Sequence, residues 1–376
     1  MILTSYQYVI FLLFIAVCPI NVTAQALGTN AAWPTFRGNQ ALTGTTSIAI
    51  PKAAKVAWVS KMASGTKSSP VIGNNSIYIG SEDGTVYCLS MDGKSKWTFK
   101  TRHTIEAPPL FHGNSVYVGT LEGELFALDA ATGKQRWMYQ TEGQISGSPN
   151  FVMAGKEKKI IVGSYDYFLH CVDDVTGKPE WKYETDNYIN CSPSVTGNLA
   201  IFGGCDGKLH VVDLSTGKAR YIINSGTYIA SSSSVSGNQA FFGDYDGAFY
   251  CVDYTTRKVI WGQPGGGSYV ASPAISANKA VIGSENRMVY CFNKGNGKII
   301  WTYKTLGKIN GSPVIAGNHV VIASNDGRLY VLDLETGKLT WSYDMGSPSG
   351  STPAIVKNLM VIATQDGHVF GFKLTS

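Results

Sequence analysis

Residues Leu332–Trp341 read LDLETGKLTW, and the chain repeats this stretch with small changes along most of its length. Further copies are LDAATGKQRW at Leu128–Trp137, VDDVTGKPEW at Val172–Trp181 and VDLSTGKARY at Val212–Tyr221. The aromatic residue that ends each copy recurs about every 40 residues, at Trp58, Trp97, Trp137, Trp181, Tyr221, Trp261, Trp301 and Trp341. A fixed period of this length is typical of repeat architectures, so the chain contains eight copies of one structural unit.

Each copy carries the signals of four short strands. A proline, or Ser233 in one copy, stands at the start of the first strand, where a missing N–H group has little effect. An acidic residue followed by glycine then separates two apolar runs, which is a strong hairpin signal. Thr-Gly-Lys leads into the fourth strand and its aromatic residue, with Arg257 in place of that glycine once. Tyr167 and Arg287 replace the hairpin glycine, so we expect those two hairpins to turn differently.

Four strands in each of eight units predict an all-β fold, an eight-bladed β-propeller of four-stranded blades, over residues 55–376. Trp58 lies in a fourth strand with no three strands before it, whereas residues 351–374 supply three strands with no fourth after them. We therefore expect the N-terminal strand, residues 55–61, to pair with residues 365–374. That pairing closes the ring and leaves no open sheet edge.

The residues before the first repeat have a different character. Residues 27–54 contain Trp33 and have no copy elsewhere, which predicts an N-terminal arm packed over the array. Residues 1–26 have no charged side chain and end in the small-x-small pattern Ala24-Gln25-Ala26, so they resemble a secretory signal peptide. Cys18 is a weaker alternative, as a lipid attachment site. We expect an exported protein, periplasmic or associated with the outer membrane, with no transmembrane segment after the signal.

Composition and charge narrow the class of function. Charged residues make up 15% of the chain, against about 25% in average proteins, while Gly (42) and Tyr (20) are abundant. This balance is typical of a turn-rich β protein. The net charge of +5 includes no Lys/Arg run longer than Lys158-Lys159. The sequence therefore shows no cluster of basic residues of the kind that binds nucleic acid.

The cysteines fall into two groups. Four of them occupy one repeat position that other copies fill with Ala or Val, which predicts buried, unpaired thiols; they are Cys88, Cys171, Cys251 and Cys291. Cys191 and Cys205 instead flank one strand pair in a single unit. They either form a disulfide in an oxidising compartment or remain free thiols.

The pattern apolar-Asp-x-x-Thr-Gly-x-x-x-Trp resembles the tryptophan-docking repeat of the quinoprotein-like, or PQQ-like, eight-bladed propellers, over nearly the whole chain after the signal. WPTFRG, from Trp33, is similar to the start of many such proteins. The resemblance implies that the repeated tryptophans dock between adjacent blades, and that Tyr221 docks less fully. It also implies one of two activities: PQQ-dependent dehydrogenase, or noncatalytic BamB-type scaffold of the outer-membrane β-barrel assembly machinery.

In this family a quinone and its calcium ion sit at the central channel. The residue three positions before each strand-starting proline should line that channel: Lys67, Glu106, Ser146, Asn190, Ala230, Val270, Asn310 and Gly350. Lys67 and Glu106 lie in neighbouring blades, which favours a salt bridge over a catalytic pair. There is no adjacent Cys-Cys pair and no Cys-x-x-Cys-His haem motif. We expect no catalytic residue, cofactor or metal, with PQQ and calcium as the alternative.

The sequence thus favours a monomeric, noncatalytic scaffold that binds envelope proteins, among them β-barrel assembly components. A PQQ-binding quinoprotein and a glycan- or cell-wall-binding propeller are the alternatives. Charged residues and tyrosines in the loops before each first strand form the candidate partner-binding face: Lys67, Arg102, His103, Glu106, Asp186, Tyr188, Tyr228, Tyr269 and Lys308. Exposed tyrosines beside charged groups suit protein recognition.

Overall fold

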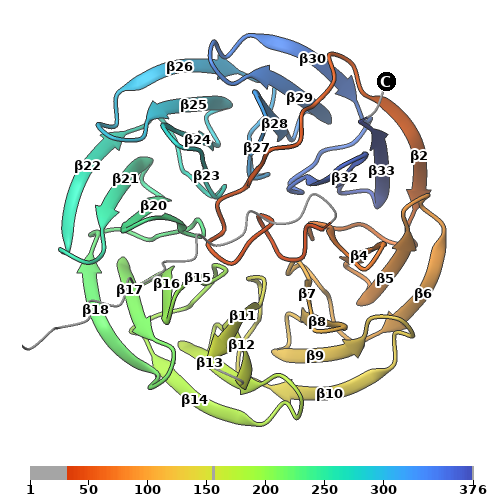
Figure 1. Cartoon of the computed structure of the whole chain (residues 1–376), viewed down its shortest axis with the longest axis vertical. Helices are drawn as coiled ribbons and strands as arrows, with labels where there is room; N and C mark the ends of the chain where they lie inside the picture. Colours follow the sequence, from red (N-terminus) through yellow and green to blue (C-terminus); the bar gives the residue numbers. More distant parts are fainter. Residues whose placement is uncertain (1–31, 155–156, 375–376) are drawn as a thin grey trace, which may run out of the picture.

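The computed structural model describes residues 32–154 and 157–374, which form a ring of eight β-sheets (Figure 1). The expected signal peptide and Cys18 lie outside the described residues. Within the described part, no helix is long and apolar enough to cross a membrane. The predicted all-β, eight-bladed architecture is confirmed.

Each blade has its first strand nearest the ring axis and its fourth strand at the rim (Figure 1). Blades 1 to 4 are β3 (Val71–Gly73), β4 (Ser76–Gly80), β5 (Thr85–Ser90), β6 (Ser95–Lys100); β7 (Leu110–His112), β8 (Ser115–Gly119), β9 (Glu124–Asp129), β10 (Gln135–Gln140); β11 (Asn150–Ala154), β12 (Glu157–Gly163), β13 (Phe168–Asp173), β14 (Pro179–Glu184); and β15 (Ser194–Thr196), β16 (Leu199–Gly203), β17 (Lys208–Asp213), β18 (Lys218–Asn224). Consecutive strands pair antiparallel within each blade.

The remaining blades follow the same order, with two additions from the N-terminal part of the chain. Blades 5 to 8 are β19 (Ser234–Ser236), β20 (Gln239–Gly243), β21 (Ala248–Asp253), β22 (Lys258–Pro264); β23 (Ala274–Ile275), β24 (Lys279–Gly283), β25 (Met288–Asn293), β26 (Ile299–Lys304); β27 (Val314–Ala316), β28 (His319–Ala323), β29 (Arg328–Asp333), β30 (Leu339–Asp344); and β31 (Ala354–Val356), β32 (Leu359–Ala363), β33 (His368–Lys373). Strand β1 (Thr45–Thr46) adds to blade 7 and β2 (Lys55–Lys61) completes blade 8.

The ring closes as predicted, between the two ends of the described chain. Strand β2 pairs antiparallel with β33 and places Trp58 opposite Gly371. Gly371 is required there, because an added Cβ would lie 2.1 Å from the Trp58 ring. Figure 1 shows the two strands side by side at the rim. The N-terminal strand β2 therefore gives blade 8 its fourth strand, next to β33.

The repeated tryptophans join each blade to the next. The Trp301 indole N–H donates to the carbonyl of Leu334 at 2.9 Å, and its ring lies against Gly337, where an added Cβ would be 2.5 Å away. The same bond joins Trp58 to Met91, Trp97 to Ala130, Trp137 to Asp174, Trp181 to Leu214 and Trp261 to Lys294. Trp341 instead donates to Pro51 of the arm at 3.1 Å, because blade 8 has no Thr-Gly-Lys turn of its own.

The two departures from this pattern compensate each other. Tyr221 replaces the docking tryptophan, and Arg257 replaces the glycine on which that tryptophan would rest. The Arg257 guanidinium lies 4.3 Å from the centre of the Tyr221 ring, a cation–π contact. The smaller phenol ring leaves space for a side chain that an indole would exclude. Blades 4 and 5 thus remain in contact through a cation–π pair in place of a tryptophan on a glycine.

The expectation that Tyr167 and Arg287 would change their hairpins is wrong. Both adopt the left-handed conformation of the glycines they replace, with φ of 75° and 72° against 81° at Gly84. Their carbonyls accept a backbone N–H from the residue after the fourth strand, as Gly84 does from Thr101, at 2.8 Å from Thr185 and 2.9 Å from Thr305. A left-handed non-glycine residue costs about 1–2 kcal/mol. The surrounding hairpin and loop bonds are sufficient to hold it.

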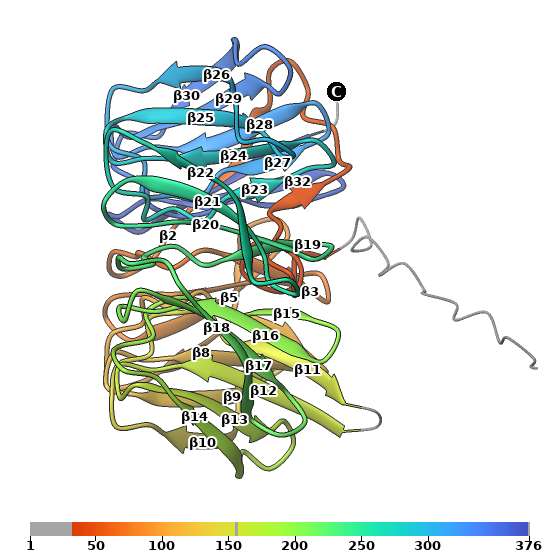
Figure 2. The same cartoon turned by 90° about the vertical axis from the view of Figure 1, so that its left-hand side faces the viewer.

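The N-terminal arm crosses the centre of one face of the ring (Figures 1 and 2). Its carbonyls accept hydrogen bonds from the inner strands of successive blades: Trp33 from Ile72, Pro34 from Phe111, Gln40 from Val195, Ala41 from Val235, Thr43 from Ile275 and Gly44 from Ile315. Strand β1 then runs parallel to β27. The arm thereby satisfies inner-strand N–H groups that have no neighbouring strand on the axis side.

Candidate functional site

A cavity of about 230 Å³ lies on the ring axis and is lined by residues of all eight blades. All eight residues predicted from their spacing to line the channel do line it. The Lys67 ammonium and the Glu106 carboxylate are 2.6 Å apart, so the expected salt bridge is present. Phe36 of the arm lines the inner end of the cavity. The channel is thus a polar pocket closed by the arm.

Below those residues, six hydroxyl groups form a ring, which we call the hydroxyl ring. Each accepts the backbone N–H of the residue at the equivalent position in the preceding blade: Ser192 from Ser148, Ser232 from Ser192, Ser272 from Ser232, Ser312 from Ser272, Thr352 from Ser312 and Ser69 from Thr352, at 2.8 to 3.3 Å. Pro108 interrupts the ring, since it has neither hydroxyl nor N–H. All six side chains are buried and line the cavity. The bonds tie neighbouring blades together around the axis.

Tyrosines form an arc on the loops and hairpins of blades 3 to 5, and all of them except Tyr165 are exposed. This tyrosine arc comprises Tyr165, Tyr167, Tyr188, Tyr228 and Tyr245. Tyr188 stacks on Tyr165 with 4.9 Å between ring centres and lies 5.3 Å from Tyr167. Tyr188, Tyr228 and Tyr245 are 42%, 56% and 54% exposed. Of the predicted binding residues, Tyr188 and Tyr228 belong to this arc.

The family model for the outer membrane protein assembly factor BamB matches residues 92–303 and 246–376. The chain belongs to the BamB family. Among curated protein sequences none matches it. The fold also resembles BamB from Moraxella catarrhalis, at 20% identity and TM-score 0.73 over 85% of this chain and 100% of that one.

Dehydrogenases share this fold with the BamB family. A europium-containing methanol dehydrogenase has a TM-score of 0.78 at 13% identity, over 92% of this chain and 98% of that one. Quinohemoprotein alcohol dehydrogenase from Comamonas testosteroni has a TM-score of 0.79 at 14% identity, over 93% and 81%. Likeness at such identities concerns the fold alone. Any functional distinction must come from the residues of the site.

The cavity of this BamB-family chain has a poor donor set for a calcium-bound quinone. Calcium takes about six to eight oxygen ligands, whereas Glu106 is the only carboxylate among the described lining residues and is already paired with Lys67. Lys67 is also the only cation among those described lining residues that could face quinone carboxylates. Within residues 32–154 and 157–374, no three His, Cys, Asp or Glu side chains are grouped to hold a metal. The residues present therefore do not fit that cofactor pair.

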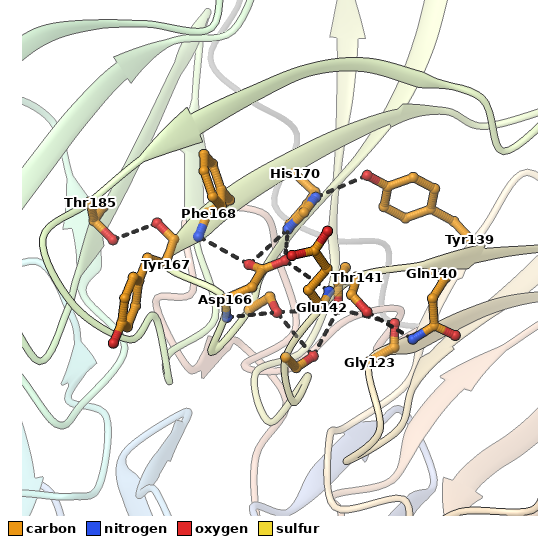
Figure 3. Close-up of polar contacts among 12 residues, drawn as sticks. Gly123, Tyr139, Gln140, Thr141, Glu142, Asp166, Tyr167, Phe168, His170 and Thr185 are labelled. Carbon is orange, nitrogen blue, oxygen red and sulfur yellow. Dashed lines mark hydrogen bonds and ion pairs between the residues drawn. The ribbon is translucent and has the colours of Figure 1, made fainter.

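Two buried Asp–His–Tyr units, which sequence reasoning missed, connect blades 2, 3 and 4 of this BamB-family propeller. His170 contacts Asp166 through Nε2 and the Tyr139 hydroxyl through Nδ1, both at 3.0 Å (Figure 3). Asp166 also accepts the Glu142 backbone N–H at 3.0 Å. The second unit has the same geometry and comprises Asp206, His210 and Tyr183. The only sequence signal was Asp-x-x-x-His in two copies.

These units hold blades together rather than activate a nucleophile. The histidines are 0% and 2% exposed, and neither lines the cavity. Burial raises the pKa of Tyr183 to about 12, so its hydroxyl stays protonated at neutral pH. At the preceding junction, between blades 1 and 2, Phe99 and Phe126 occupy the equivalent positions and pack edge to face without any such bond. The same pair of positions between adjacent blades is thus filled by Tyr and His in two junctions and by two phenylalanines in another.

We expect acid to remove the stabilisation that these units provide. Burial alone would raise the pKa of Asp166, but the His170 contact and two backbone N–H groups outweigh it and lower the pKa. A lowered carboxyl pKa gives stability that is complete above the unfolded value, about 4, and is lost as pH falls through the folded value. The double variant Y139F/H170F copies Phe99 and Phe126. When the pH falls below about 4, its free energy of unfolding should decrease less than that of the wild-type protein. Urea unfolding of both proteins at a series of pH values measures this. The same decrease in the free energy of unfolding for variant and wild type would contradict the prediction.

Tyr269 was expected on the partner-binding face, and this is wrong. It is fully buried and stands where other copies have isoleucine, as at Ile229 and Ile309. An added Cβ at Gly243 would lie 2.3 Å from Tyr269, so the side chain packs on that glycine. Burial raises the pKa of its phenol well above the ordinary value. The isoleucines at the equivalent positions of other copies could have predicted that Tyr269 is buried in the core.

The other predicted residues are distributed around the face. Arg102 is exposed, and His103 lies 3.0 Å from Glu124. Asp186 pairs with Lys208 beside the tyrosine arc, and Lys308 lies 3.6 Å from Glu285. The structure therefore brings Lys67 together with Glu106 and places Asp186 near the arc, while the remaining charges stand apart.

The disulfide that the sequence left open is not formed in the structure. Cys191 and Cys205 are both free thiols. The Cys191 thiol is buried and donates to the Gly203 carbonyl at 3.0 Å. Burial raises its pKa to about 12, which makes it unreactive.

Proposed function

We propose that this BamB-family propeller is a noncatalytic scaffold that binds envelope proteins through the tyrosine arc. The arc is the observation that carries the proposal, because it exposes several aromatic rings on adjacent loops of one face. Tyrosine is enriched among the residues that dominate protein–protein binding energy. The family description and the signal-like first 26 residues support an envelope location.

The loops that carry the arc are held in place before any partner binds. The carbonyl of Tyr188 accepts the backbone N–H of Cys205 at 2.9 Å, and that of Tyr228 accepts the N–H of Tyr245 at 2.9 Å. Each loop before a first strand is thus bonded to the hairpin of the following blade. A preorganised surface loses less conformational entropy on binding. This rigidity supports a platform role.

The competing interpretation is a quinone-dependent dehydrogenase. The structural similarity to dehydrogenases suggests this interpretation. The cavity, however, has a single carboxylate among its described lining residues, and that carboxylate is already in an ion pair. A volume of about 230 Å³ is also below the range of roughly 300–1,000 Å³ that is common for small-molecule pockets. These two observations favour the scaffold.

Removing two rings of the arc should weaken partner binding. We expect Y188A/Y228A to retain about one tenth or less of the β-barrel assembly components that co-purify with the wild-type protein, since each anchoring tyrosine contributes about 2 kcal/mol. The control is M138A, because Met138 is 43% exposed, like Tyr188, but lies on rim strand β10. Quantitative mass spectrometry of purified envelope complexes measures the outcome. Equal recovery with both variants would contradict the proposal.

A further inference from the structure

We propose that the hydroxyl ring binds a small oxyanion of the phosphate or sulfate class, with Arg37 next to it as the compensating cation. The site is separate from the tyrosine arc and does not depend on the scaffold function. Two independent observations support it: among the described residues, the protons of these six hydroxyls have no acceptor, and Arg37 has no counterion.

The six hydroxyl groups are arranged to donate inward. Each already accepts a backbone N–H from the neighbouring blade, which occupies one side of its oxygen. Among the described residues, none accepts the proton of any of these six hydroxyls. The side chains are 2% to 6% exposed, so the cavity is the direction left for that proton. A buried donor without an acceptor costs free energy, and the four oxygens of a phosphate or sulfate ion would supply acceptors to several of these hydroxyls.

Arg37 supplies positive charge next to the ring, behind the residues that line the cavity. It is fully buried and donates to the carbonyls of Pro273 at 2.6 Å and Pro313 at 2.5 Å. Those prolines directly follow Ser272 and Ser312 of the hydroxyl ring. Burial lowers the pKa of Arg37 to about 9, so the guanidinium remains charged at neutral pH.

This cation has no acidic partner in the part of the chain that the structure describes, and its Nε has no hydrogen-bond acceptor there. A buried charge is normally paired, because removing it from water is costly. Converging donors next to an uncompensated cation are the chemistry of an oxyanion site. Water molecules can accept the hydroxyl protons, but they cannot neutralise the guanidinium. The cavity volume of about 230 Å³ accommodates one such ion with water.

The test is calorimetric titration of the purified protein with inorganic phosphate and with sulfate, against chloride at matched ionic strength. We expect one saturable site for each oxyanion and none for chloride. The variant S272A/S312A removes two donors next to Arg37 and should weaken binding by about tenfold or more. The matched control is S272T/S312T, which keeps both hydroxyls as Thr352 does naturally, and it should bind as the wild type does.

A second measurement does not depend on the stability of any variant. Crystals of the wild-type protein soaked in selenate should give an anomalous difference peak inside the hydroxyl ring. A selenate peak elsewhere, or no peak, would overturn the proposal. So would equal titration curves for phosphate and chloride, or unchanged phosphate binding in S272A/S312A when that variant is folded by circular dichroism.

Discussion

Replacing Trp301 with alanine is expected to lower the free energy of unfolding by about 3–5 kcal/mol, the usual loss for a large buried aromatic side chain. Trp301 is 8% exposed and joins two blades through its bond to Leu334 and its contact with Gly337. Its removal leaves a cavity at a junction between two separate sheets, β23–β26 and β27–β30, which side-chain packing holds together. Equilibrium urea unfolding measures the change.

The neighbouring residue on the same strand is the control for this variant. Ile300 is 43% exposed and points away from the junction, so I300A should cost less than about 1 kcal/mol. The two substitutions remove apolar side chains from adjacent positions on β26. Similar losses for W301A and I300A would show that docking is not what stabilises the ring.

The glycine beneath the same tryptophan should be almost as sensitive. Gly337 has a φ of 70°, and an added Cβ would lie 2.5 Å from Trp301. Alanine there loses about 1–2 kcal/mol to the left-handed backbone and about 1–3 kcal/mol more to overpacking. We therefore expect G337A to lower the free energy of unfolding by about 2–5 kcal/mol, measured by the same urea titration.

Gly346 separates the two causes. It has a φ of 80°, but nothing lies within 4 Å of the position that an added Cβ would take, so G346A should show only the backbone cost. The double variant W301A/G337A should recover the overpacking part, because the indole is gone. If G337A and G346A lost the same stability, the indole contact would contribute nothing.

The repeat predicts most of the fold because each of its residues has one structural role in every copy. The aromatic at its end docks on a glycine in the next blade, and the unpaired strand around Trp58 can only close the ring with β33. Tyr167 was misjudged for a physical reason. Local bonds in the hairpin and the adjoining loop hold a left-handed residue that sequence preference alone disfavours.

The candidate site was less predictable, because it depends on where the copies differ. Spacing from the proline located the channel-lining residues, since every blade places that position at the axis. The hydroxyl ring was missed although a serine or threonine precedes the strand start in seven copies. Tyr165 and Tyr245 were missed because the stacking of Tyr165 on Tyr188 and the exposure of Tyr245 depend on how hairpins meet the adjoining loops.

Photo-crosslinking in cells of the source organism tests most directly whether this propeller binds envelope proteins through the tyrosine arc. The photoreactive residue p-benzoylphenylalanine replaces Tyr188 in one strain and Met138, on the rim strand β10, in another. We expect a covalent adduct between position 188 and a β-barrel assembly component, and none from position 138. No adduct at position 188, or the same adduct from both positions, would contradict it.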